Sequence, residues 1–371
     1  MRIAQVVPAG AHPYSGVPTV IVQLSLHLAR RGHHVEVWLL QPWNRSEEAV
    51  LHGSTLAAAG VPLITASPGR RRFHALAERP IGIVHLHSVF TPPNALLARR
   101  LQAPYVVSPH GGYAPASLAR SALRKALYMR LVEQRLVRGA ALRVALTDTE
   151  AGDLRTVGAP EPIAVIPNGV TPVPRHVDAT AFRRELGLDA AHRLLLFVGR
   201  LDVFHKGLDV LIRGLAAAPG WHAALVGPDF RGGSDRLRSL AGALGAGSRL
   251  SLTGPRHGKA LHEAFAAADC FALTSRWEGL PLSLLEALAH GVPAVVSPAV
   301  DRLVGAVAAG AGWSASPVEL GALLRRLQHL DGEERERRAA AARALAARYD
   351  WASIARRYEA AYTGVLDGTS R

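Results

Sequence analysis

The chain has 371 residues, more than one hydrophobic core usually organises, so two domains are expected. Hydrophobic residues make up 49% of it, yet no apolar run reaches the roughly 18 residues that a membrane-spanning helix needs. The net charge of +14 favours anionic partners such as nucleotides, phospholipid surfaces or nucleic acids, although an arginine-rich composition explains part of the excess.

The cysteine content and the N-terminal residues indicate the cellular compartment in which the protein is expected. The single cysteine, Cys270, excludes an internal disulfide, and its apolar neighbours predict a buried strand position. The first eight residues contain one arginine and an apolar run too short for the core of a secretion signal. We therefore expect a cytoplasmic protein.

The first half of the chain alternates between β-branched apolar segments and helical segments. Residues 2–7 predict a strand, residues 8–16 are rich in turn formers, and Pro18 suits the first turn of a helix that Gly32 ends. Further strands are expected at residues 33–40, 83–86, 105–108, 144–147 and 164–166. This alternation predicts a parallel sheet covered by helices.

The same pattern returns after the proline-rich stretch 167–174. Strands are expected at residues 194–198, 223–226, 250–252, 270–274 and 294–296, which predicts a second doubly wound domain. From Glu333 onward the chain is helical, and an apolar stripe through Trp351, Ile354, Tyr358 and Tyr362 predicts packing against the body. We place an N-terminal domain at 1–172, a C-terminal domain at 173–346, and a helix at 347–371 that crosses back toward the N-terminal domain.

The strongest indication of chemistry is a pair of glutamates where a strand ends and a helix begins. Glu278 falls in the loop and Glu286 about one turn into the helix, so both can face the crevice where open α/β sheets bind ligands. Carboxylates accept hydrogen bonds from vicinal hydroxyl groups, as in a sugar or a ribose. The turn between them leaves N–H groups at a helix start, which favours phosphate. The alternative is that Glu278 only caps the helix and Glu286 is solvated.

A pair of cations follows the strand at 194–198. Arg200 and Lys206 can neutralise a diphosphate together, the arginine through its planar fork and the lysine as a point charge. A leaving nucleoside diphosphate needs this compensation, because negative charge builds on it as the glycosidic bond breaks. Alone the two cations could be ordinary surface residues; beside the glutamate pair they favour a phosphate site.

These motifs resemble those of the retaining GT-B glycosyltransferases of family 4 (glycosyl transferases group 1), which include sucrose synthases and transferases of cell-envelope glycans. The similarity lies in Glu-x7-Glu at Glu278 and Glu286, Gly-Arg-x5-Lys-Gly at Gly199–Gly207, and Ile-Pro-Asn-Gly-Val at 166–170. It implies a GT-B architecture: two Rossmann-like doubly wound parallel-sheet domains that face a cleft, with a C-terminal helix packing back on the body. It also implies sugar transfer without a cofactor or an obligatory metal, and the sequence contains no Asp-x-Asp motif.

The resemblance assigns the donor site residue by residue. Arg200 and Lys206 would bind the diphosphate of a nucleotide sugar, Glu286 the ribose hydroxyls, and Glu278 the transferred sugar. With His110, we expect Arg200, Lys206 and Glu278 to be the catalytic residues.

Further donor contacts follow from the same resemblance. Backbone N–H groups of Gly279, Leu280 and Leu282 would complete the phosphate and sugar contacts. Arg256, in the segment Gly254-Pro255-Arg256, matches the place where the family holds the base.

The N-terminal half matches the family less closely. The family has a histidine beside the donor sugar where this chain has His110, which follows a strand and precedes two glycines. Gly16 matches the family's first glycine-rich loop, where the backbone approaches phosphates or acceptor, although many members have two glycines there. His85 and His87 share one face of a strand, but without further ligands we expect them to be structural and not a metal site.

Residues 117–143 form the most basic segment. They carry seven arginine or lysine residues against one acid, and Leu123, Leu127 and Leu131 recur at helical spacing. This pattern predicts a basic amphipathic helix suited to an anionic membrane surface, as in family members with lipid-linked acceptors. The alternative is an ordinary helix whose leucines pack on its own domain.

We therefore expect a retaining hexosyltransferase that moves a hexose from a nucleotide-diphosphate sugar to an acceptor hydroxyl. The acceptor would be a glycan, a lipid-linked molecule or a small molecule, in cell-envelope polysaccharide, lipid-linked glycan or glycoconjugate biosynthesis, with peripheral attachment at the inner membrane face. A nucleotide-sugar epimerase of the same architecture and a transferase for soluble small molecules are alternatives. An NAD-dependent oxidoreductase is disfavoured because no G-x-G-x-x-G follows the first strand. No nucleic-acid partner is expected, since neither a reading helix nor stacking strands are evident.

Overall fold

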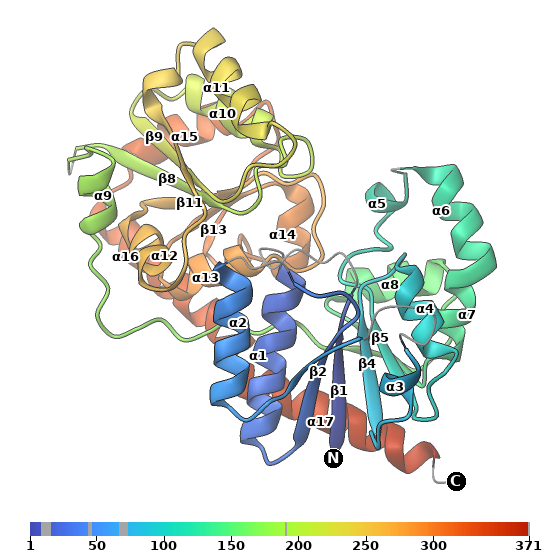
Figure 1. The fold of residues 1–371 in the computed structure, drawn as a ribbon. Coiled ribbons are helices and arrows are strands. Elements are labelled where there is room, and N and C mark those ends of the chain that lie inside the picture. Colours follow the sequence, from blue (N-terminus) through green and yellow to red (C-terminus); the bar gives the residue numbers. More distant parts are fainter. Residues whose placement is uncertain (9–15, 44–46, 67–72, 120, 190, 370–371) are drawn as a thin grey trace. The chain divides into compact units, whose positions relative to one another are not determined.

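The computed structural model describes residues 1–8, 16–43, 47–66, 73–119, 121–189 and 191–369. Contacts divide the chain into two compact units (Figure 1): Met1–Gly169 together with Trp351–Arg371, and Val170–Asp350. Each unit contains one parallel sheet with helices packed against it. Below, these are called the first unit and the second unit.

The first unit contains a seven-stranded parallel sheet in the order β3-β2-β1-β4-β5-β6-β7. Its strands are β1 (Arg2–Val7), β2 (His34–Leu39), β3 (Leu63–Thr65), β4 (Ile83–His87), β5 (Tyr105–Ser108), β6 (Leu142–Ala145) and β7 (Ile163–Val165). The strand order reverses direction at β1, so β1 and β4 occupy the centre, where nearly every side chain is buried. Ligands of doubly wound sheets bind at such a switch point.

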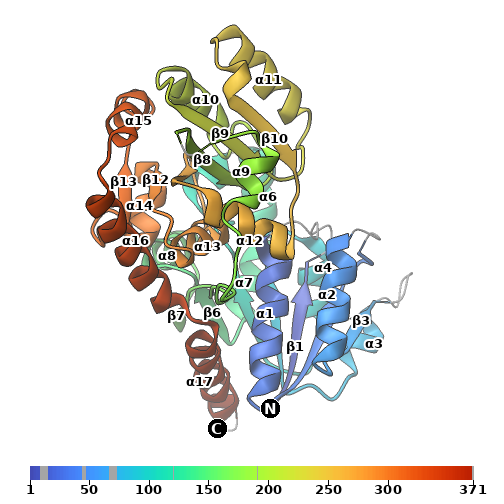
Figure 2. The ribbon, with the colours of Figure 1, turned by 90° about the vertical axis from the view of Figure 1, so that its left-hand side faces the viewer.

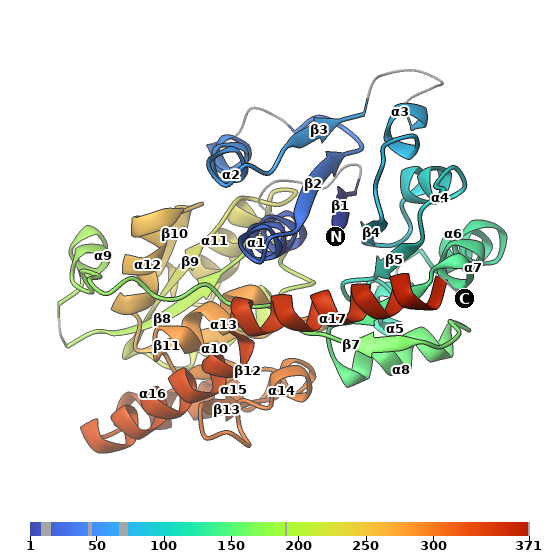
Figure 3. The same cartoon turned by 90° about the horizontal axis from the view of Figure 1, so that it is seen from below.

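The helices of the first unit connect these strands and cover the sheet. They are α1 (Gly16–Arg30), α2 (Glu47–Ala58), α3 (His74–Ala77), α4 (Pro92–Ala98), α5 (Pro115–Ala119), α6 (Ala122–Tyr128), the π-helix η1 (Met129–Glu133), α7 (Gln134–Gly139), α8 (Asp148–Thr156) and α17 (Trp351–Thr369). The last helix, α17, lies beside α1 (Figure 3). The chain thus returns to its first unit at the end.

The apolar stripe expected on the C-terminal helix is confirmed. Trp351, Ile354, Tyr358 and Tyr362 are each at most 2% exposed. A Cβ atom on Gly169 would lie 2.3 Å from the Trp351 ring, so the loop that leaves the first unit fits against this indole only as glycine. Burial of four large side chains, each of which contributes about 1.5–3 kcal/mol, fixes α17 to the first unit.

The second unit has a six-stranded parallel sheet in the order β10-β9-β8-β11-β12-β13. Its strands are β8 (Arg193–Val198), β9 (Trp221–Val226), β10 (Leu250–Gly254), β11 (Cys270–Leu273), β12 (Ala294–Val296) and β13 (Gly312–Ser314). Its helices are α9 (Ala181–Glu185), α10 (Leu208–Ala216), α11 (Gly233–Ala243), η2 (Gly247–Arg249), α12 (Gly258–Ala267), α13 (Leu282–Ala289), α14 (Pro298–Val304), α15 (Leu320–Gln328), α16 (Gly332–Ala346) and η3 (Ala347–Tyr349). Helices α10 and α15 pack together, as do α13 and α16 (Figure 2).

Most expected strands are present, and the differences have physical causes. The three-residue strands β3 and β13 were not expected, because Leu-Ile-Thr and Gly-Trp-Ser are not the continuous apolar runs that marked the equally short β7 and β12. The strand expected at 144–147 begins earlier, at Leu142. It includes Arg143, a residue that ordinarily argues against a buried strand. Its guanidinium is buried because it donates to the carbonyl oxygens of Val137 and Arg138, each at 2.7 Å.

The hydropathy of the helices agrees with the absence of a long apolar run in the sequence. Over the described ranges, no helix combines the length and the hydropathy that crossing a bilayer requires.

We predict that Gly207→Ala destabilises the second unit far more than Gly245→Ala. Both residues have a positive φ, 62° and 67°, so alanine strains either by about 1 kcal/mol. A Cβ atom on Gly207 would also lie 2.1 Å from the Thr274 carbonyl oxygen, whereas one on Gly245 meets nothing within 4 Å. We expect a loss of about 3 kcal/mol or more for Gly207→Ala, measured by thermal and urea unfolding. Equal losses for the two variants would contradict this close contact.

Candidate active site

The two strongest sequence motifs meet where neighbouring strands end. Strand β11 pairs with β8, so the loops after them lie side by side. The Thr274 hydroxyl donates to the Gly207 carbonyl oxygen at 2.9 Å, and the Arg276 N–H donates to the His205 carbonyl oxygen at 2.9 Å. The expectation that Gly-Arg-x5-Lys-Gly and Glu-x7-Glu form one site is therefore supported by direct contacts.

A lysine–glutamate ion pair lies at the centre of this meeting point. Lys206 Nζ donates to Glu278 Oε1 at 2.7 Å, and the Ser275 hydroxyl donates to the same oxygen at 2.6 Å. The side chains of Lys206 and Glu278 are only 15% and 9% exposed. Burial alone would raise the pKa of Glu278, but the Lys206 charge and these hydrogen bonds hold the pKa below its usual value. Glu278 is therefore ionised and accepts hydrogen bonds only.

The loops around this pair are held by a second set of contacts. The Arg276 guanidinium forms two hydrogen bonds to Asp209, at 2.9 and 2.8 Å, in the first turn of α10. The His205 ring stacks on Trp277 with 4.3 Å between centroids. Sequence reasoning missed these supports, since nothing in the sequence alone shows which neighbours of a motif contact each other. They fix the backbone that carries Lys206 and Glu278.

The other glutamate of the motif has a different environment. Glu286 lies on α13, half-buried, and in the described part of the chain its carboxylate forms no ion pair. Burial raises the pKa of Glu286 to about 7. A carboxylate without a cation can still be stabilised by neutral donors, and hydroxyl groups are the donors that a ribose offers.

Arg200 follows β8 and carries a charge that no acid neutralises within the described ranges. Its guanidinium carbon lies 5.0 Å from the centroid of the Phe230 ring, over whose face it stacks. The backbone beside it is tightly packed, because a Cβ atom on Gly227 would lie 2.0 Å from the Gly199 carbonyl oxygen. The combination of a free guanidinium and glycine-lined backbone suits an anionic ligand.

The structure gives the remaining donor candidates of the second unit distinct surroundings. Arg256 pairs with Glu185 and its guanidinium carbon lies 4.8 Å from the Phe182 ring centroid, both on α9. Gly279 and Leu280 belong to the turn before α13, and Leu282 is the first residue of that helix. These positions are compatible with the expected backbone contacts, which stay a prediction.

His110, in the first unit, follows β5 with a φ of 53°, a strained value for a residue with a side chain. Its Nε2 lies 2.9 Å from His87 Nδ1. The next residue, Gly111, donates its N–H to Glu150, which also accepts from the Leu146 N–H at 2.6 Å. Burial lowers the pKa of His110 to about 4, so its imidazole is neutral at physiological pH.

The other candidates of the first unit are placed as follows. Gly16 is the exposed first residue of α1, whereas Tyr14 and Ser15 beside it lie outside the described residues. His85 and His87 are fully buried, with 3.9 Å between ring centroids. They share a face as expected, but the contact of His87 with His110 was not anticipated.

Comparison with known proteins identifies the family of this chain. Residues 14–173 match the family model for Glycosyltransferase Family 4, and residues 178–345 match that for Glycosyl transferases group 1. The D-inositol 3-phosphate glycosyltransferase of Mycolicibacterium gilvum (strain PYR-GCK) is 30% identical over 81% of this chain and 73% of its own length. The chain belongs to glycosyltransferase family 4. It is an enzyme of the glycosyltransferase class, as the resemblance implied.

Solved structures confirm the GT-B fold expected for this glycosyltransferase. Anabaena HepE, solved in complex with UDP and glucose, superposes with a TM-score of 0.79 at 21% identity over 98% of this chain and 100% of HepE. Sucrose-phosphate synthase from Thermosynechococcus elongatus gives a TM-score of 0.79 at 20% identity over 99% of both chains. At this identity the likeness establishes the fold and nothing finer.

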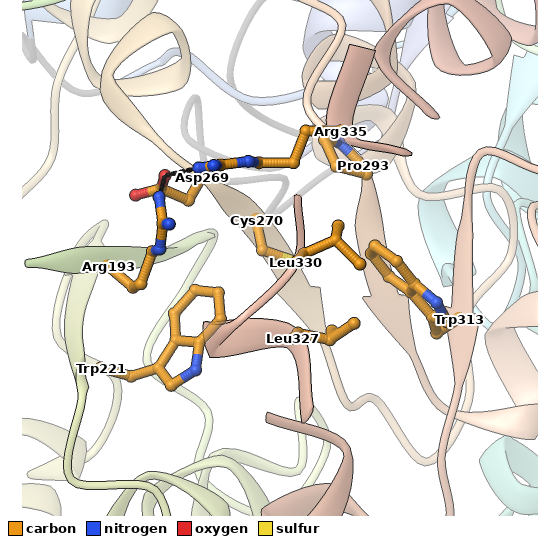
Figure 4. Close-up of a pocket in the computed structure, with 9 residues that line it drawn as sticks. All are labelled: Arg193, Trp221, Asp269, Cys270, Pro293, Trp313, Leu327, Leu330 and Arg335. Atoms are coloured by element: carbon orange, nitrogen blue, oxygen red, sulfur yellow. Dashed lines mark hydrogen bonds and ion pairs between the residues drawn. The ribbon is translucent and has the colours of Figure 1, made fainter. Parts of the chain in front are cut away.

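A small pocket of about 260 Å³, open to solvent, lies at the opposite end of the second sheet (Figure 4). Arg193, Trp221 and Cys270, which line it, are the first residues of β8, β9 and β11. Asp269 at its rim accepts hydrogen bonds from Arg183 and Arg193, at 2.5 and 3.1 Å. None of the expected site residues lines it, so this pocket belongs to an ion-pair cluster that ties strand starts together.

We predict that Glu286→Gln stabilises the glycosyltransferase at alkaline pH. A carboxyl with a raised pKa binds its proton more tightly in the folded state, so its contribution to stability is lost as pH rises from about 4.5 through about 7. The variant should gain on the order of 2 kcal/mol over the wild type above about pH 8, and nothing below about pH 5. Thermal unfolding across this range measures the difference.

The exposed Glu336 provides the control, because its side chain is 74% exposed and pairs only at the surface. Glu336→Gln should differ from the wild type by a constant amount across the pH range. A Glu286→Gln variant whose advantage does not grow with pH would show that Glu286 is not desolvated.

Proposed function

We propose that this glycosyltransferase moves a hexose from a nucleotide-diphosphate sugar to an acceptor hydroxyl with retention of configuration. The observation that carries the proposal is the Lys206–Glu278–Ser275 cluster between the ends of β8 and β11. It places an ionised carboxylate and a cation within 2.7 Å, which suits a ligand with hydroxyl groups next to a phosphate. Arg200 adds a second cation on the same loop.

The proposed division of roles follows from the two carboxylates. Glu278, ionised and held by Lys206, accepts hydrogen bonds from the hydroxyls of the transferred hexose. Glu286, unpaired and desolvated, accepts from the two ribose hydroxyls, which stabilise its charge without a cation. Arg200 and Lys206 bind the diphosphate, and His110 contacts the substrate sugar. HepE was solved with UDP and glucose and with UDP-glucose, which supports a donor of this chemical class.

The proposed reaction needs no metal, since the two cations supply the charge that a bound metal would. The bond between the anomeric carbon and the diphosphate oxygen breaks, and Arg200 and Lys206 stabilise the negative charge that develops on the leaving group. The acceptor hydroxyl attacks the same face of the sugar, and its proton passes to the departing diphosphate oxygen. The enzyme then acts chiefly by positioning the reactants and by excluding water.

A nucleotide-sugar epimerase was the alternative of the same architecture. The matched families and the relative described above are glycosyltransferases, which favours transfer to an acceptor over epimerisation.

The acceptor side is proposed from the basic segment 117–143, which is not the single helix that the sequence predicted: it is divided among α5, α6, η1 and α7, and Arg143 lies buried in β6. Leu123, Leu127 and Leu131 follow each other at one helical turn and are 89%, 60% and 56% exposed, so this stripe does not pack on its own unit. Arginines such as Arg124 and Arg130 flank it. An apolar stripe edged by cations matches an anionic lipid surface, where leucines enter the interface and arginines meet phosphate groups. We propose a peripheral enzyme at the inner membrane face with a lipid-linked or envelope-glycan acceptor.

The donor assignment predicts that one nucleoside diphosphate stabilises the wild type and that Lys206→Ala and Glu286→Gln lose this gain. A thermal-shift panel of UDP, GDP, ADP and TDP with their sugars measures it. A ligand at 100-fold its Kd contributes about 2.7 kcal/mol, which is readily detected. Lys259→Ala is the control, because Lys259 is 82% exposed on α12 and forms a surface ion pair with Glu263.

If no nucleotide stabilises the wild type, or if the Lys206→Ala and Lys259→Ala variants respond equally, the assignment of the donor site is wrong.

Once the stabilising donor is known, NMR of the anomeric linkage in the product tests whether the configuration is retained. An inverted linkage contradicts the proposed same-face attack.

The membrane assignment predicts co-sedimentation with vesicles of anionic phospholipid, weak binding to zwitterionic vesicles, and loss of binding at high salt. Replacing Leu123, Leu127 and Leu131 together by serine should lower the partition coefficient by about tenfold or more, because burying each leucine contributes more than 1 kcal/mol. Val318→Ser, at a valine 90% exposed in the second unit, is the control. Equal binding by the triple variant and the wild type would contradict a role for the stripe.

A further inference from the structure

A continuous chain of polar side chains crosses the centre of the first sheet and ends at His110. It contains, in order, Ser108, His85, Tyr362, Gln5, His87 and His110. The five members before His110 are fully buried, whereas His110 is partly exposed. The glycosyltransferase reaction proposed above uses only this last member, so the function of the other five is unexplained.

Strand register brings these side chains together. Gln5 on β1 is paired with His85 on β4, and His87 on β4 is paired with Ser108 on β5. Side chains two residues apart point to the same face of a sheet, which stacks His85 on His87. The Tyr362 hydroxyl, on α17, lies between Gln5 and His85 and forms a hydrogen bond with each. The arrangement is therefore a product of the central strands and the returning helix.

The orientation of the Gln5 amide sets the direction of hydrogen bonding along the chain. Gln5 Oε1 can only accept, so His87 Nε2, at 2.8 Å, carries a proton. In a neutral imidazole the other nitrogen is then an acceptor, so His87 Nδ1 accepts from His110 Nε2 at 2.9 Å. His110 Nδ1 is left without a proton. A reversed Gln5 amide would reverse every one of these protons.

The hydrogen bonds from the Gln5 amide nitrogen onward, through Tyr362 and His85, are consistent with this direction. Its Nε2 donates to the Tyr362 hydroxyl at 3.1 Å, and this hydroxyl donates its own proton to His85 Nδ1 at 2.7 Å. His85 Nε2 then donates to the Ser108 hydroxyl at 2.7 Å. The amide nitrogen and oxygen of Gln5 thus each form a hydrogen bond, and the Tyr362 hydroxyl both accepts and donates. Burial also lowers the pKa values of His85 and His87 well below their usual range, which keeps both rings neutral.

We propose that Gln5, acting through His87, holds His110 as the neutral Nε2–H tautomer, so that His110 Nδ1 accepts a hydrogen bond from a hydroxyl group of the substrate sugar. Gln5 and His87 are positioning residues, since neither reaches the surface. The hydroxyl contact rests on the proposed function, whereas the tautomer does not. A site built this way discriminates against a sugar that lacks the hydroxyl, because His110 would then be left without a donor.

The loop that carries His110 is fixed independently of this chain. Glu150 accepts from the Gly111 N–H and holds the turn in which His110 has its positive φ. His87 therefore controls the orientation and protonation of the ring, and Glu150 the position of the backbone. A substitution at His87 is expected to change the ring without displacing the loop.

The tautomer is tested by long-range proton–nitrogen NMR on full-length protein labelled with ¹⁵N-histidine, at about pH 7 and without substrate. The chain has 17 histidines, so His110→Asn identifies the resonances of His110 by difference. We expect a protonated Nε2 and an unprotonated Nδ1. His87→Leu should produce a mixture of tautomers, and His87→Asn, whose side-chain oxygen still accepts from His110, should restore one form.

Leu86→Ala is the matched control, because Leu86 is equally buried on the same strand, between His85 and His87, yet its side chain points to the other face of the sheet. It should destabilise the protein about as much as His87→Leu while the His110 tautomer stays as in the wild type. An Nδ1–H tautomer or an imidazolium at His110 in the wild type overturns the inference. This outcome does not depend on whether any donor is found.

Kinetic measurements test the hydroxyl contact, with the donor that the thermal-shift panel identifies as substrate. His87→Leu should lower kcat about tenfold with little change in nucleotide affinity, His87→Asn should recover most of it, and Leu86→Ala should leave kcat unchanged. Equal kcat for the wild type and a folded His87→Leu variant would overturn the contact. If no donor is turned over by the wild type, the proposed function fails, and the NMR result still decides the tautomer.

Discussion

The ion pair between Lys206 and Glu278 is the interaction on which the proposed donor site of this glycosyltransferase depends. The two residues are 72 positions apart in sequence and meet only because β8 and β11 are neighbours in the sheet. Their meeting also requires Gly207, since any side chain there would collide with Thr274. Removing one member would leave a desolvated charge, which typically costs about 3–5 kcal/mol. The pair therefore couples the stability of the second unit to its chemistry.

The two glutamates of the motif are chemically alike and are separated by their environments. Glu278 keeps its charge because a lysine and a serine hydroxyl compensate for burial, and its pKa lies below the usual value. Glu286 is half-buried, its carboxylate forms no ion pair with the residues that the structure describes, and burial raises its pKa to about 7. Pairs of carboxyl groups with diverging pKa values mark a division of roles. In the proposed roles, Glu278 accepts hydrogen bonds from a sugar beside Lys206. Glu286 gains hydrogen-bond donors when the ligand binds.

Sequence motifs indicated which two loops form the proposed donor site but not the contacts between these loops. The resemblance assigned Lys206, Glu278 and Glu286 to one site, and the structure brings Lys206 into contact with Glu278. The partners that hold them, such as the Arg276–Asp209 pair, leave no spacing pattern because they join two loops. Likewise, leucines at helical spacing predict a stripe but not whether it is covered, and only the exposure of Leu123 decides this.

The buried histidines show a further limit of sequence reasoning. His85 and His87 were expected to be structural, and their complete burial agrees with that expectation. Burial of five linked polar side chains among apolar strands is costly unless every donor finds an acceptor, so such a chain has few allowed proton arrangements. The Gln5 side chain selects among them, because its nitrogen can only donate and its oxygen can only accept, whereas either nitrogen of a histidine can carry the proton. A glutamine that pattern analysis treats as one polar residue in an apolar strand thus determines which nitrogen of His110 is open to a ligand.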